Sequence, residues 1–562
     1  MSATPDCTPQ GCPTKPTACS RREVAEKIAE YDALDSPWTS CRQIAKQGGV
    51  PARTLCHWVW RKRTLLKNSP WPEAVTWFLE TPEGVDFLHR LFTAAHLVFV
   101  QAGDGGLRNL TWFLQLSDLD VFIASSSGAQ QAVAQEVESL LVRFGEEEDQ
   151  RLAAGMSPRE ITLCEDETFH PQICLVAIEP VSNFILVEQY QPQRTTQTWQ
   201  QCTEAKLAAL PLTVCQVTSD LAKALIAQAE TCLGAHHSPD LFHVQYDTVK
   251  ATSGALASQT RAARRELTKR QEKTTAFAAQ RQADPAGCGL GSLVDVFAQR
   301  AREAEAEARQ RLDVCQARQE RAQVARRGLS RDYHPVDLLT GQPLSAEEVG
   351  RRLQGHFDTL EQVAAEAGLS ARAHEKLAKA RRALGAMEAT VSFFWSMLAI
   401  WLTGWGYDAG VQQWLRQELI PGYYLRRVAR KAQPASQRQR LRTLATEVLA
   451  RARSPDGLWG TFSPALQAEL ESRAQQCADL FQRSSSCVEG RNGQLSLRHH
   501  ALHHLRLRKL QALTVLHNYA VSRQDGSTAA SRFYGVAPRD LFDWLLEHLS
   551  PPARPRAKRR AA

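Results

Sequence analysis

The hydrophobic pattern is strand-like over residues 161–190, where β-branched and aromatic residues form short runs separated by Pro, Asn and Ser (ITLCEDETFHPQICLVAIEPVSNFILVEQY). This pattern predicts three strands, at Ile161–Thr168, Ile173–Ile178 and Phe184–Gln189. Further elements are predicted downstream in the order helix, buried strand, helix, strand: Thr198–Leu210, Leu212–Thr218, Leu221–Cys232 and Asp240–Gln245. The order β-β-β-α-β-α-β predicts an α/β core in which helices cover a mixed five-stranded sheet.

Residues 248–483 show helical periodicity and little sign of a strand. Arg264–Arg281 and Ser292–Arg327 are long charged runs, rich in Ala, Glu, Gln and Arg, that predict an antiparallel hairpin turning near residues 284–287. This block lies between the last predicted strand and a closing basic segment. We therefore expect a large all-α insertion that interrupts the sheet domain, and an independent helical domain is the alternative.

Residues 21–67 carry the pattern of a helix-turn-helix, with Gly48-Gly49 at the turn and Leu55 and Trp58 on the buried face of the second helix. The second helix continues into a basic run suited to phosphate contacts. The side chains expected to face DNA are Arg53, Thr54, His57 and Arg61. The alternative is a helical hairpin that binds nothing.

These patterns divide the chain into seven expected segments, which we list in order. They are a disordered tail (1–20), a helix-turn-helix domain (21–67), a helical connector (68–156), the first part of the α/β core (157–247), the all-α insertion (248–483), closing helices of the core (484–549) and a basic disordered tail (550–562).

Composition is that of a soluble globular protein, with 43% hydrophobic and 23% charged residues among 562. The net charge of +8 is modest, so an anionic partner would have to be met by local basic patches. Such patches are Arg61–Lys67, Arg261–Lys273, Arg426–Arg442, Arg498–Lys509 and Arg554–Arg560.

The 14 cysteines include no CxxC pair, which indicates reduced thiols in a cytosol-like compartment. No apolar leader opens the chain. Ala389–Tyr407 is uncharged and nearly long enough to span a bilayer, but Ser, Thr and Gly dilute it. We interpret it as a buried or interface helix and expect no membrane association.

The triplet Glu165-Asp166-Glu167 is out of place in an apolar strand, because buried carboxylates need a cation or solvent. Asp220 ends the fourth predicted strand, and Glu489 precedes a basic helix. If these carboxylates converge, they could hold two divalent ions for phosphodiester cleavage, and oxygen ligands favour Mg²⁺ or Mn²⁺. We therefore predict Asp166, Asp220 and Glu489 as metal ligands and catalytic residues.

Several segments resemble the blocks of bacterial DDE-type transposases, the insertion-sequence enzymes of the RNase H-like, retroviral integrase superfamily. They are ITLCEDETF, VTSDLAKAL, PDLFHV, CVEGRNGQLSLRHH and LHNYAVSRQDGSTAASRF. The resemblance covers Ile161–Gln245 and Cys487 to about Phe533, and it implies an RNase H-like core with Asp166, Asp220 and Glu489 as the acidic triad. One departure is Ser496, where many relatives have a basic residue; Arg498 or His499 could substitute for it.

Each triad member has an alternative. Strand alternation puts Glu165 and Glu167 on the face opposite Asp166, so either glutamate could be the ligand instead. Asp220 could simply cap the following helix, and Glu489 could be a surface residue.

A second cluster of candidate ligands lies in the HHSPDLFH segment. Asp240 and His243, with His236 and His237, superficially resemble a zinc cluster. The segment lacks ligand pairs at a familiar spacing, so a loop and a satisfied strand histidine are expected instead.

The resemblance implies a DNA transposase that cuts and joins DNA ends, acting on double-stranded DNA as at least a homodimer. Arg498, Arg506 and Lys509 on the basic C-terminal helix are further expected DNA contacts. A cytoplasmic, nucleoid-associated location follows. Two alternatives remain: a catalytically inactive, transposase-derived DNA-binding protein, and a helical protein-interaction scaffold.

Overall fold

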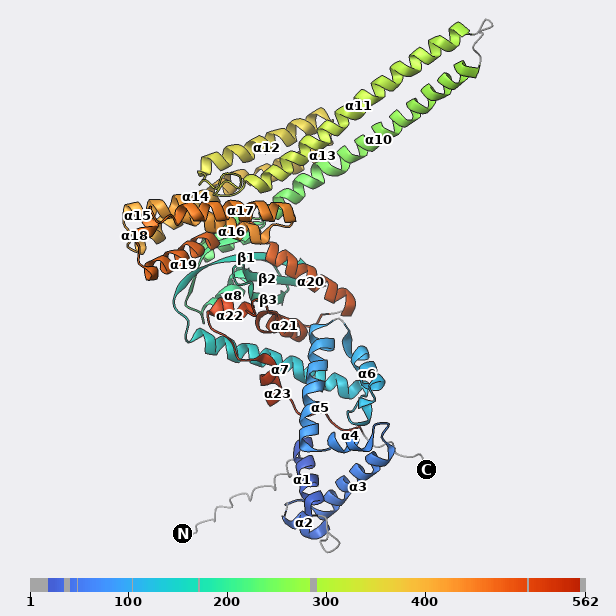
Figure 1. Ribbon diagram of the computed structural model, residues 1–562, viewed down its shortest axis with the longest axis vertical. Helices are drawn as coiled ribbons and strands as arrows, with labels where there is room; N and C mark the ends of the chain where they lie inside the picture. Colours follow the sequence, from blue (N-terminus) through green and yellow to red (C-terminus); the bar gives the residue numbers. More distant parts are fainter. Residues whose placement is uncertain are drawn as a thin grey trace, which may run out of the picture. The chain divides into compact units, whose positions relative to one another are not determined.

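The computed structural model describes residues 19–34, 41–47, 49–103, 105–169, 172–283, 291–502 and 505–555. The chain divides into two compact units, one formed by Met1–Gly155 with Ser496–Ala562 and the other by Met156–Leu495 (Figure 1). The boundary at residues 495 and 496 falls inside helix α20 (Ser486–Leu502), so the expected closing segment 484–549 is shared between the units. Most of both expected disordered tails lies outside the described residues.

The second unit contains a mixed five-stranded sheet, as the sequence predicts. Its strands are β1 (Arg159–Phe169), β2 (Ile173–Glu179), β3 (Phe184–Gln191), β4 (Leu212–Ser219) and β5 (His236–Pro239). Their spatial order is β3-β2-β1-β4-β5; β1, β2 and β3 pair antiparallel, whereas β4 is parallel to both β1 and β5. Parallel neighbours need crossover connections. These are helix α8 (Thr196–Leu207) before β4, and helix α9 (Lys223–Ala227) with the π-helical turn η3 (Gln228–Cys232) before β5.

The fifth strand is not where the sequence pattern predicts it. The predicted strand Asp240–Gln245 is wrong, because β5 occupies His236–Pro239 and helix α10 begins at Leu241. The Asp240 carboxylate accepts a hydrogen bond from the Phe242 backbone N–H at 3.0 Å, as a residue preceding a helix does. Leu241 and Val244 are then buried at helical spacing while Phe242 is 44% exposed. A run this short fits the spacing of buried residues in a strand as well as that in a helix. The hydrogen bond that the Asp240 carboxylate accepts at the start of the run stabilises the helix.

The rest of the second unit is helical, and within its described residues from 248 to 483 there is no strand beyond an isolated bridge between Val336 and Pro343. Helices α10 and α11 run side by side as a long hairpin (Figure 1), which confirms the predicted pairing; the predicted turn at 284–287 lies outside the described residues. The helices of this block are α10 (Leu241–Ala283), α11 (Gly291–Asp332), α12 (Ala346–Glu366), α13 (Ala371–Arg381), α14 (Leu384–Gly404), α15 (Ala409–Trp414), η4 (Leu415–Leu419), α16 (Ile420–Lys431), α17 (Ala435–Ala452), α18 (Leu458–Thr461) and α19 (Pro464–Leu480).

Helix α14 is the apolar segment singled out in the sequence. Among the described residues, the run Ala371–Gly404 is the one stretch long and apolar enough to cross a membrane by length and composition alone. One side of α14 is buried in the helical core through Met387, Val391, Phe394 and Leu398. This side of α14 belongs to the helical core, and 33% of the most apolar window of the run is buried.

The first unit is helical throughout its described part. Its elements are α1 (Arg21–Leu34), α2 (Cys41–Gln47), α3 (Ala52–Asn68), α4 (Glu73–Phe78), α5 (Pro82–Ala95), η1 (His96–Ala102), α6 (Gly106–Leu116), η2 (Leu119–Val121), α7 (Ser127–Ala153), α21 (Leu507–Val515), η5 (Leu516–Ala520), α22 (Ala529–Tyr534) and α23 (Leu541–His548). Between α2 and α3, Gly49 has a φ of +66°, a conformation that glycine adopts without strain. Tyr31 of α1, Ala45 of α2 and Leu55 of α3 form a small core of their own.

Candidate metal centre

Asp166 lies on the central strand β1, on the sheet face covered by α20. It stands opposite Val176 of β2, which in turn stands opposite Glu188 of β3, so the three side chains share one face. Asp166 is 8% exposed, and its Oδ2 atom accepts a hydrogen bond from the Asn492 side-chain amide at 3.1 Å. Asp166 is therefore a buried carboxylate that a hydrogen bond from a residue of α20 holds in place.

Helix α20 is fixed over this face by a buried ion pair. The Arg491 guanidinium donates two hydrogen bonds to the Glu188 carboxylate, at 2.7 and 2.6 Å, and the two side chains are 5% and 0% exposed. Glu489 and Asn492 lie three residues apart on the same helix and so share its face. The Glu489 carboxyl is in hydrogen-bonding contact with Asp166. The anchor thus places Glu489 and Asn492 over the same strand residue.

The start of α20 is tied to Asp240, between β5 and α10. Ser485 donates from its backbone N–H and its hydroxyl to the two Asp240 oxygens, at 3.1 and 2.8 Å, and the Ser485 carbonyl accepts from the Glu489 N–H at 3.0 Å. Asp240 also contacts His243 Nδ1 at 2.8 Å. One ligand atom each from Asp240, His243 and Glu489 lies within 4.8 Å of the others. These three side chains form a group that could hold a metal ion.

Asp220 follows β4, the parallel neighbour of β1. The register pairs Cys164 with Thr218, and continuing it by two residues sets Asp220 beside Asp166. The Asp220 carboxylate accepts from the Ala222 N–H at 2.8 Å, but helix α9 begins at Lys223 with Ala222 as its N-cap. Asp220 therefore supports the turn before the helix without being the capping residue. It lines a cavity of about 200 Å³ together with Asp240 and His243.

The group carries an excess of carboxylates over cations. Burial, together with the nearby Glu489 and Asp220 carboxylates, raises the pKa of Asp166 to about 7. Burial also raises the pKa of Glu489. The hydrogen bond to Asp240 raises the pKa of His243 to about 9, so this imidazole is a cation at neutral pH. A bound divalent ion would offset the same repulsion that now favours protonated acids.

Strand alternation places the two glutamates beside Asp166 on the opposite face of β1, although burial and the nearby Asp220 carboxylate both raise the pKa of Glu167. Glu165 is fully buried, and neither of its carboxylate oxygens has a hydrogen-bond partner. Burial and the neighbouring Glu167 raise the pKa of Glu165 to about 8, which keeps it neutral. Glu167 is contacted by the Trp199 indole N–H and by Arg194, each at 3.5 Å. Strand alternation thus separates Asp166 from both alternatives that the sequence leaves open.

The sequence analysis considers Asp240 and His243 as ligands but favours a loop and a strand histidine, and it does not identify Asn492. The expected strand position of His243 is wrong, because it lies on α10 one turn after Asp240 and hydrogen-bonds to it. The available signal was an Asp that precedes a helix followed by a His three residues later, a spacing that brings side chains together on a helix but not on a strand. The same spacing relates Glu489 to Asn492.

The four expected DNA contacts near the N-terminus lie on α3. Arg53 and His57 are exposed, and His57 stacks on Trp60 with ring centroids 5.9 Å apart. Thr54 is half-buried. Arg61 donates to the Pro555 carbonyl, and burial lowers its pKa. Arg53 and His57 therefore remain candidates for DNA contact, whereas the guanidinium of Arg61 is used within its own unit.

The three expected DNA contacts near the C-terminus also divide into exposed residues and residues whose charge is used within the fold. Arg506 is exposed before α21. The Arg498 guanidinium donates to the Ala102 carbonyl. Lys509 is only 8% exposed, and its ammonium donates to the Val100 carbonyl at 2.7 Å and to the Gln101 side chain. The placement of Lys509 on a DNA-facing surface is therefore wrong, because its charge stabilises the fold.

Comparison with known proteins finds a similarity to one family model. Residues 415–561 are similar to the model of a family of unknown function (DUF6399). This segment includes Glu489, Arg491 and Asn492 but none of the strands of the sheet. No curated protein and no solved structure matches the chain. The function therefore has to be argued from the site.

Proposed function

We propose that the protein is a DNA transposase of the DDE type, with Asp166, Asp220 and Glu489 as its acidic triad. The observation that carries the proposal is the convergence of these residues from the central strand, the end of its parallel neighbour and a helix far along the chain. Asp166 interacts with both of the others, and Glu489 contacts Asp166 directly. Asp166 is buried and the other two are half-buried, and burying a carboxylate is costly without a cation.

The sheet supports the RNase H-like core that the sequence resemblance implies. Three antiparallel strands come first, and two parallel strands then add beside β1 through helical crossovers. The helical insertion follows β5, and the chain returns to the sheet through α20. The carboxylates of the proposed triad are therefore brought together only when the segments on both sides of the insertion fold as one unit.

The donor set fits hard divalent ions. Asp166, Asp220, Asp240 and Glu489 offer carboxylate oxygens, which Mg²⁺ and Mn²⁺ prefer. His243 could add one imidazole nitrogen, a ligand that favours Mn²⁺ over Mg²⁺, but only by releasing the proton that it carries at neutral pH. When bound there, two such ions would supply activation of the attacking hydroxyl and stabilisation of the leaving oxygen.

The protein's own residues would orient the ligands. Asn492 fixes one oxygen of Asp166, and Ser485 and His243 hold Asp240. Such outer contacts set the direction in which a carboxylate presents its free oxygen. The helices α2 and α3, with Arg53 and His57 exposed, would bind element ends as a helix-turn-helix. Acting on two DNA ends, the transposase would work as at least a homodimer at the nucleoid.

The test is cleavage of DNA that flanks the coding region, with Mn²⁺ or Mg²⁺. We expect the wild-type chain to nick or cut this DNA at defined ends, and Asp166→Asn to lose the activity. Glu167→Gln is the matched control, because it makes the same change one residue away on the opposite face. Activity in Asp166→Asn equal to wild type would remove Asp166 from catalysis.

The same preparation separates the alternatives. End-specific DNA binding by wild type without cleavage would favour an inactive, transposase-derived DNA-binding protein. Absence of DNA binding at low salt would favour a helical scaffold, since phosphate contacts weaken steeply as salt rises.

A further inference from the structure

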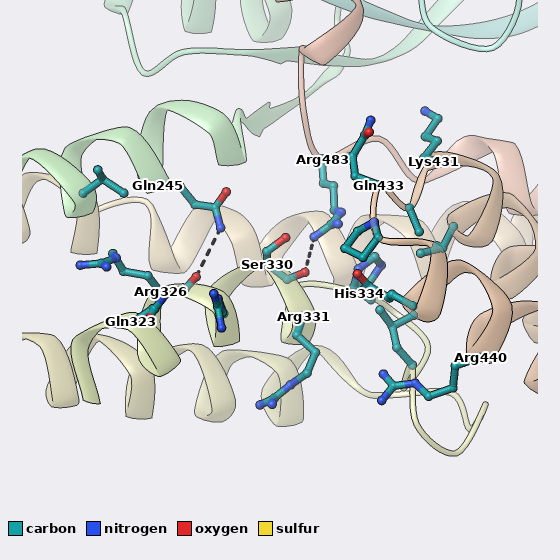
Figure 2. Close-up of a pocket in the computed structure, with 17 residues that line it drawn as sticks. Gln245, Gln323, Arg326, Ser330, Arg331, His334, Lys431, Gln433, Arg440 and Arg483 are labelled. Atoms are coloured by element: carbon teal, nitrogen blue, oxygen red, sulfur yellow. Dashed lines mark hydrogen bonds between the residues drawn. The ribbon is translucent and has the colours of Figure 1, made fainter. Parts of the chain in front are cut away.

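A second site is suggested by a cavity in the helical block, away from the carboxylate group. The cavity has a volume of about 930 Å³ and lies between α10, α11, α16 and α17, next to the segment that leads into α20 (Figure 2). Two hydrogen bonds join the elements that line it: Gln245 of α10 donates to the Arg326 carbonyl of α11 at 3.3 Å, and Arg483 donates to the Ser330 carbonyl of α11 at 2.7 Å. These bonds hold the lining elements together.

The lining is strongly basic. Of the 17 residues that line the cavity, none is acidic and six carry a guanidinium or ammonium group: Arg326, Arg327, Arg331, Lys431, Arg440 and Arg483. These six residues come from three helices and the segment before α20. The fold therefore brings together basic side chains that are far apart in the sequence. A concave surface of one sign concentrates ions of the opposite sign.

Most of this charge is not balanced by carboxylates. Arg331 is paired with Asp332 through two hydrogen bonds of 2.8 and 2.9 Å. Arg326 donates to the Thr252 hydroxyl at 2.7 Å, which supplies no negative charge. Within the described part of the chain, no salt bridge is made by Arg327, Lys431 or Arg440. Burial and the adjacent Arg327 lower the pKa of Arg326, as expected for unbalanced like charges.

The shape and chemistry of the lining select the ligand class. The volume falls in the range of about 300–1,000 Å³ typical of small-molecule sites. The one aromatic ring among the 17 lining residues is the buried imidazole of His334, so the cavity offers charge and no exposed aromatic surface for stacking a base. Guanidinium groups match phosphate oxygens in pairs, and the lining glutamines such as Gln323 and Gln437 add amide donors.

His334 is a buried and neutral residue of the lining. It is 2% exposed, and its Nδ1 atom lies 2.6 Å from the Tyr424 hydroxyl. Burial lowers the pKa of His334 well below its usual value, so the ring is neutral. If Tyr424 donates to Nδ1, the proton of the ring is on Nε2, which is itself buried. His334 therefore belongs to the wall of the cavity and adds no charge to it.

We propose that this cavity binds closely spaced phosphate groups, such as the triphosphate of a nucleoside triphosphate or the terminal phosphate and first phosphodiesters of a 5′-phosphorylated DNA end. Arg327, Lys431 and Arg440 would contact the phosphate oxygens, and Arg326 and Arg483 would form the basic wall behind them. This activity goes beyond the proposed cleavage of DNA, because it does not involve Asp166, Asp220 or Glu489.

The test is calorimetric titration of the full chain with inorganic tripolyphosphate in EDTA, so that no divalent ion can link the ligand to the carboxylates. We expect one tripolyphosphate per chain. The double variant Arg327→Gln with Arg440→Gln should bind at least about tenfold more weakly, because two charge-assisted contacts are lost. The control is Arg311→Gln with Arg442→Gln, which removes the same charge from exposed positions of α11 and α17 outside the cavity. It should stay within about twofold of wild type.

The source of the phosphate is separated by two further titrations, with ATP and with a 5′-phosphorylated oligonucleotide. Tighter binding of ATP would assign the site to free nucleotides, and tighter binding of the oligonucleotide would assign it to DNA ends. Asp166→Asn should bind tripolyphosphate as wild type does, so failure of the proposed transposase function would leave this result unchanged. Saturable binding to none of the three, or equal weakening by both double variants, would overturn the proposal.

Discussion

At the scale of single residues, the environment of Asp166 depends on Asn492. The Asn492 amide donates to one Asp166 oxygen at 3.1 Å. Because the amide carries no charge, it orients Asp166 without competing with a cation. Asn492 is therefore a positioning residue in the proposed site.

Replacing Asn492 with alanine should lower metal-dependent DNA cleavage by about 10–100-fold, the usual cost of losing an outer partner of a metal ligand. The measurement is the initial cleavage rate across a Mn²⁺ titration, which should also show a higher Mn²⁺ requirement. Ser486→Ala, an exposed change on the same helix, is the control. A rate and a Mn²⁺ requirement both equal to wild type would show that Asn492 does not position Asp166.

Burial of His96 in the first unit makes a second residue-scale prediction, on pH. His96 is fully buried, bonds to Gln130 at 2.8 Å, and burial lowers its pKa from 6.5 to about 4. Between pH 6.5 and 4 the unfolded chain binds the proton and the folded chain does not. Stability should therefore fall as the pH drops through this window, by up to about 3 kcal/mol from this group.

Urea midpoints measured between pH 7 and 4 check this expectation. His96→Met removes the titrating group and should flatten the profile, whereas His500→Gln, at an exposed histidine of the same unit, should not. Profiles of wild type and His96→Met that run parallel over this range would contradict the assignment.

At the scale of elements, the site depends on how α20 is seated on the sheet. Both side chains of the Arg491–Glu188 ion pair are buried. Removing either charge would leave the other buried without an opposite charge, which is strongly destabilising. The ion pair sits two residues from Glu489, and any shift of α20 would move the proposed ligand away from Asp166. The ion pair thus links the stability of the sheet to the geometry of the site.

Glu188→Gln should destabilise the protein by about 3–5 kcal/mol, because it leaves the Arg491 guanidinium buried without a partner. Urea unfolding of Glu188→Gln, Arg491→Met and the double variant checks this, and the double variant should be more stable than the sum of the single losses predicts. Glu266→Gln, in the exposed pair with Arg270 on α10, should change stability by less than about 1 kcal/mol. Additive losses at 188 and 491 would contradict the coupling.

The elements also show how far sequence pattern reaches. Strands β1 to β4 and the α10–α11 hairpin follow from runs of apolar residues and from helical periodicity, which are local properties. The last strand was misplaced, because the decision between strand and helix at Asp240 depends on a backbone hydrogen bond to its carboxylate. A six-residue pattern does not contain that information.

At the scale of the whole molecule, the second unit unites segments that the helical insertion separates in sequence. Asp166 and Asp220 were predictable as neighbours because adjacent parallel strands bring their ends together. Asp240 and His243 were not predictable as members of this site, because their position depends on a contact between Asp240 and Ser485, which lies 245 residues later in the chain. Lys509 was placed on a DNA-facing surface for a related reason. The sequence of a basic helix does not show which of its charged side chains donate hydrogen bonds to backbone carbonyl groups within the fold.

The central claim is that Asp166 and Glu489, with Asp220, bind divalent metal, and calorimetric titration of the full chain with Mn²⁺ tests it most directly. We predict saturable binding by wild type, weakened at least about tenfold in Asp166→Asn and in Glu489→Gln, because each removes a ligand. Glu167→Gln, on the opposite face of β1, should bind as wild type does. Binding that is unchanged in Asp166→Asn and Glu489→Gln, or lost only in Glu167→Gln, would contradict the account.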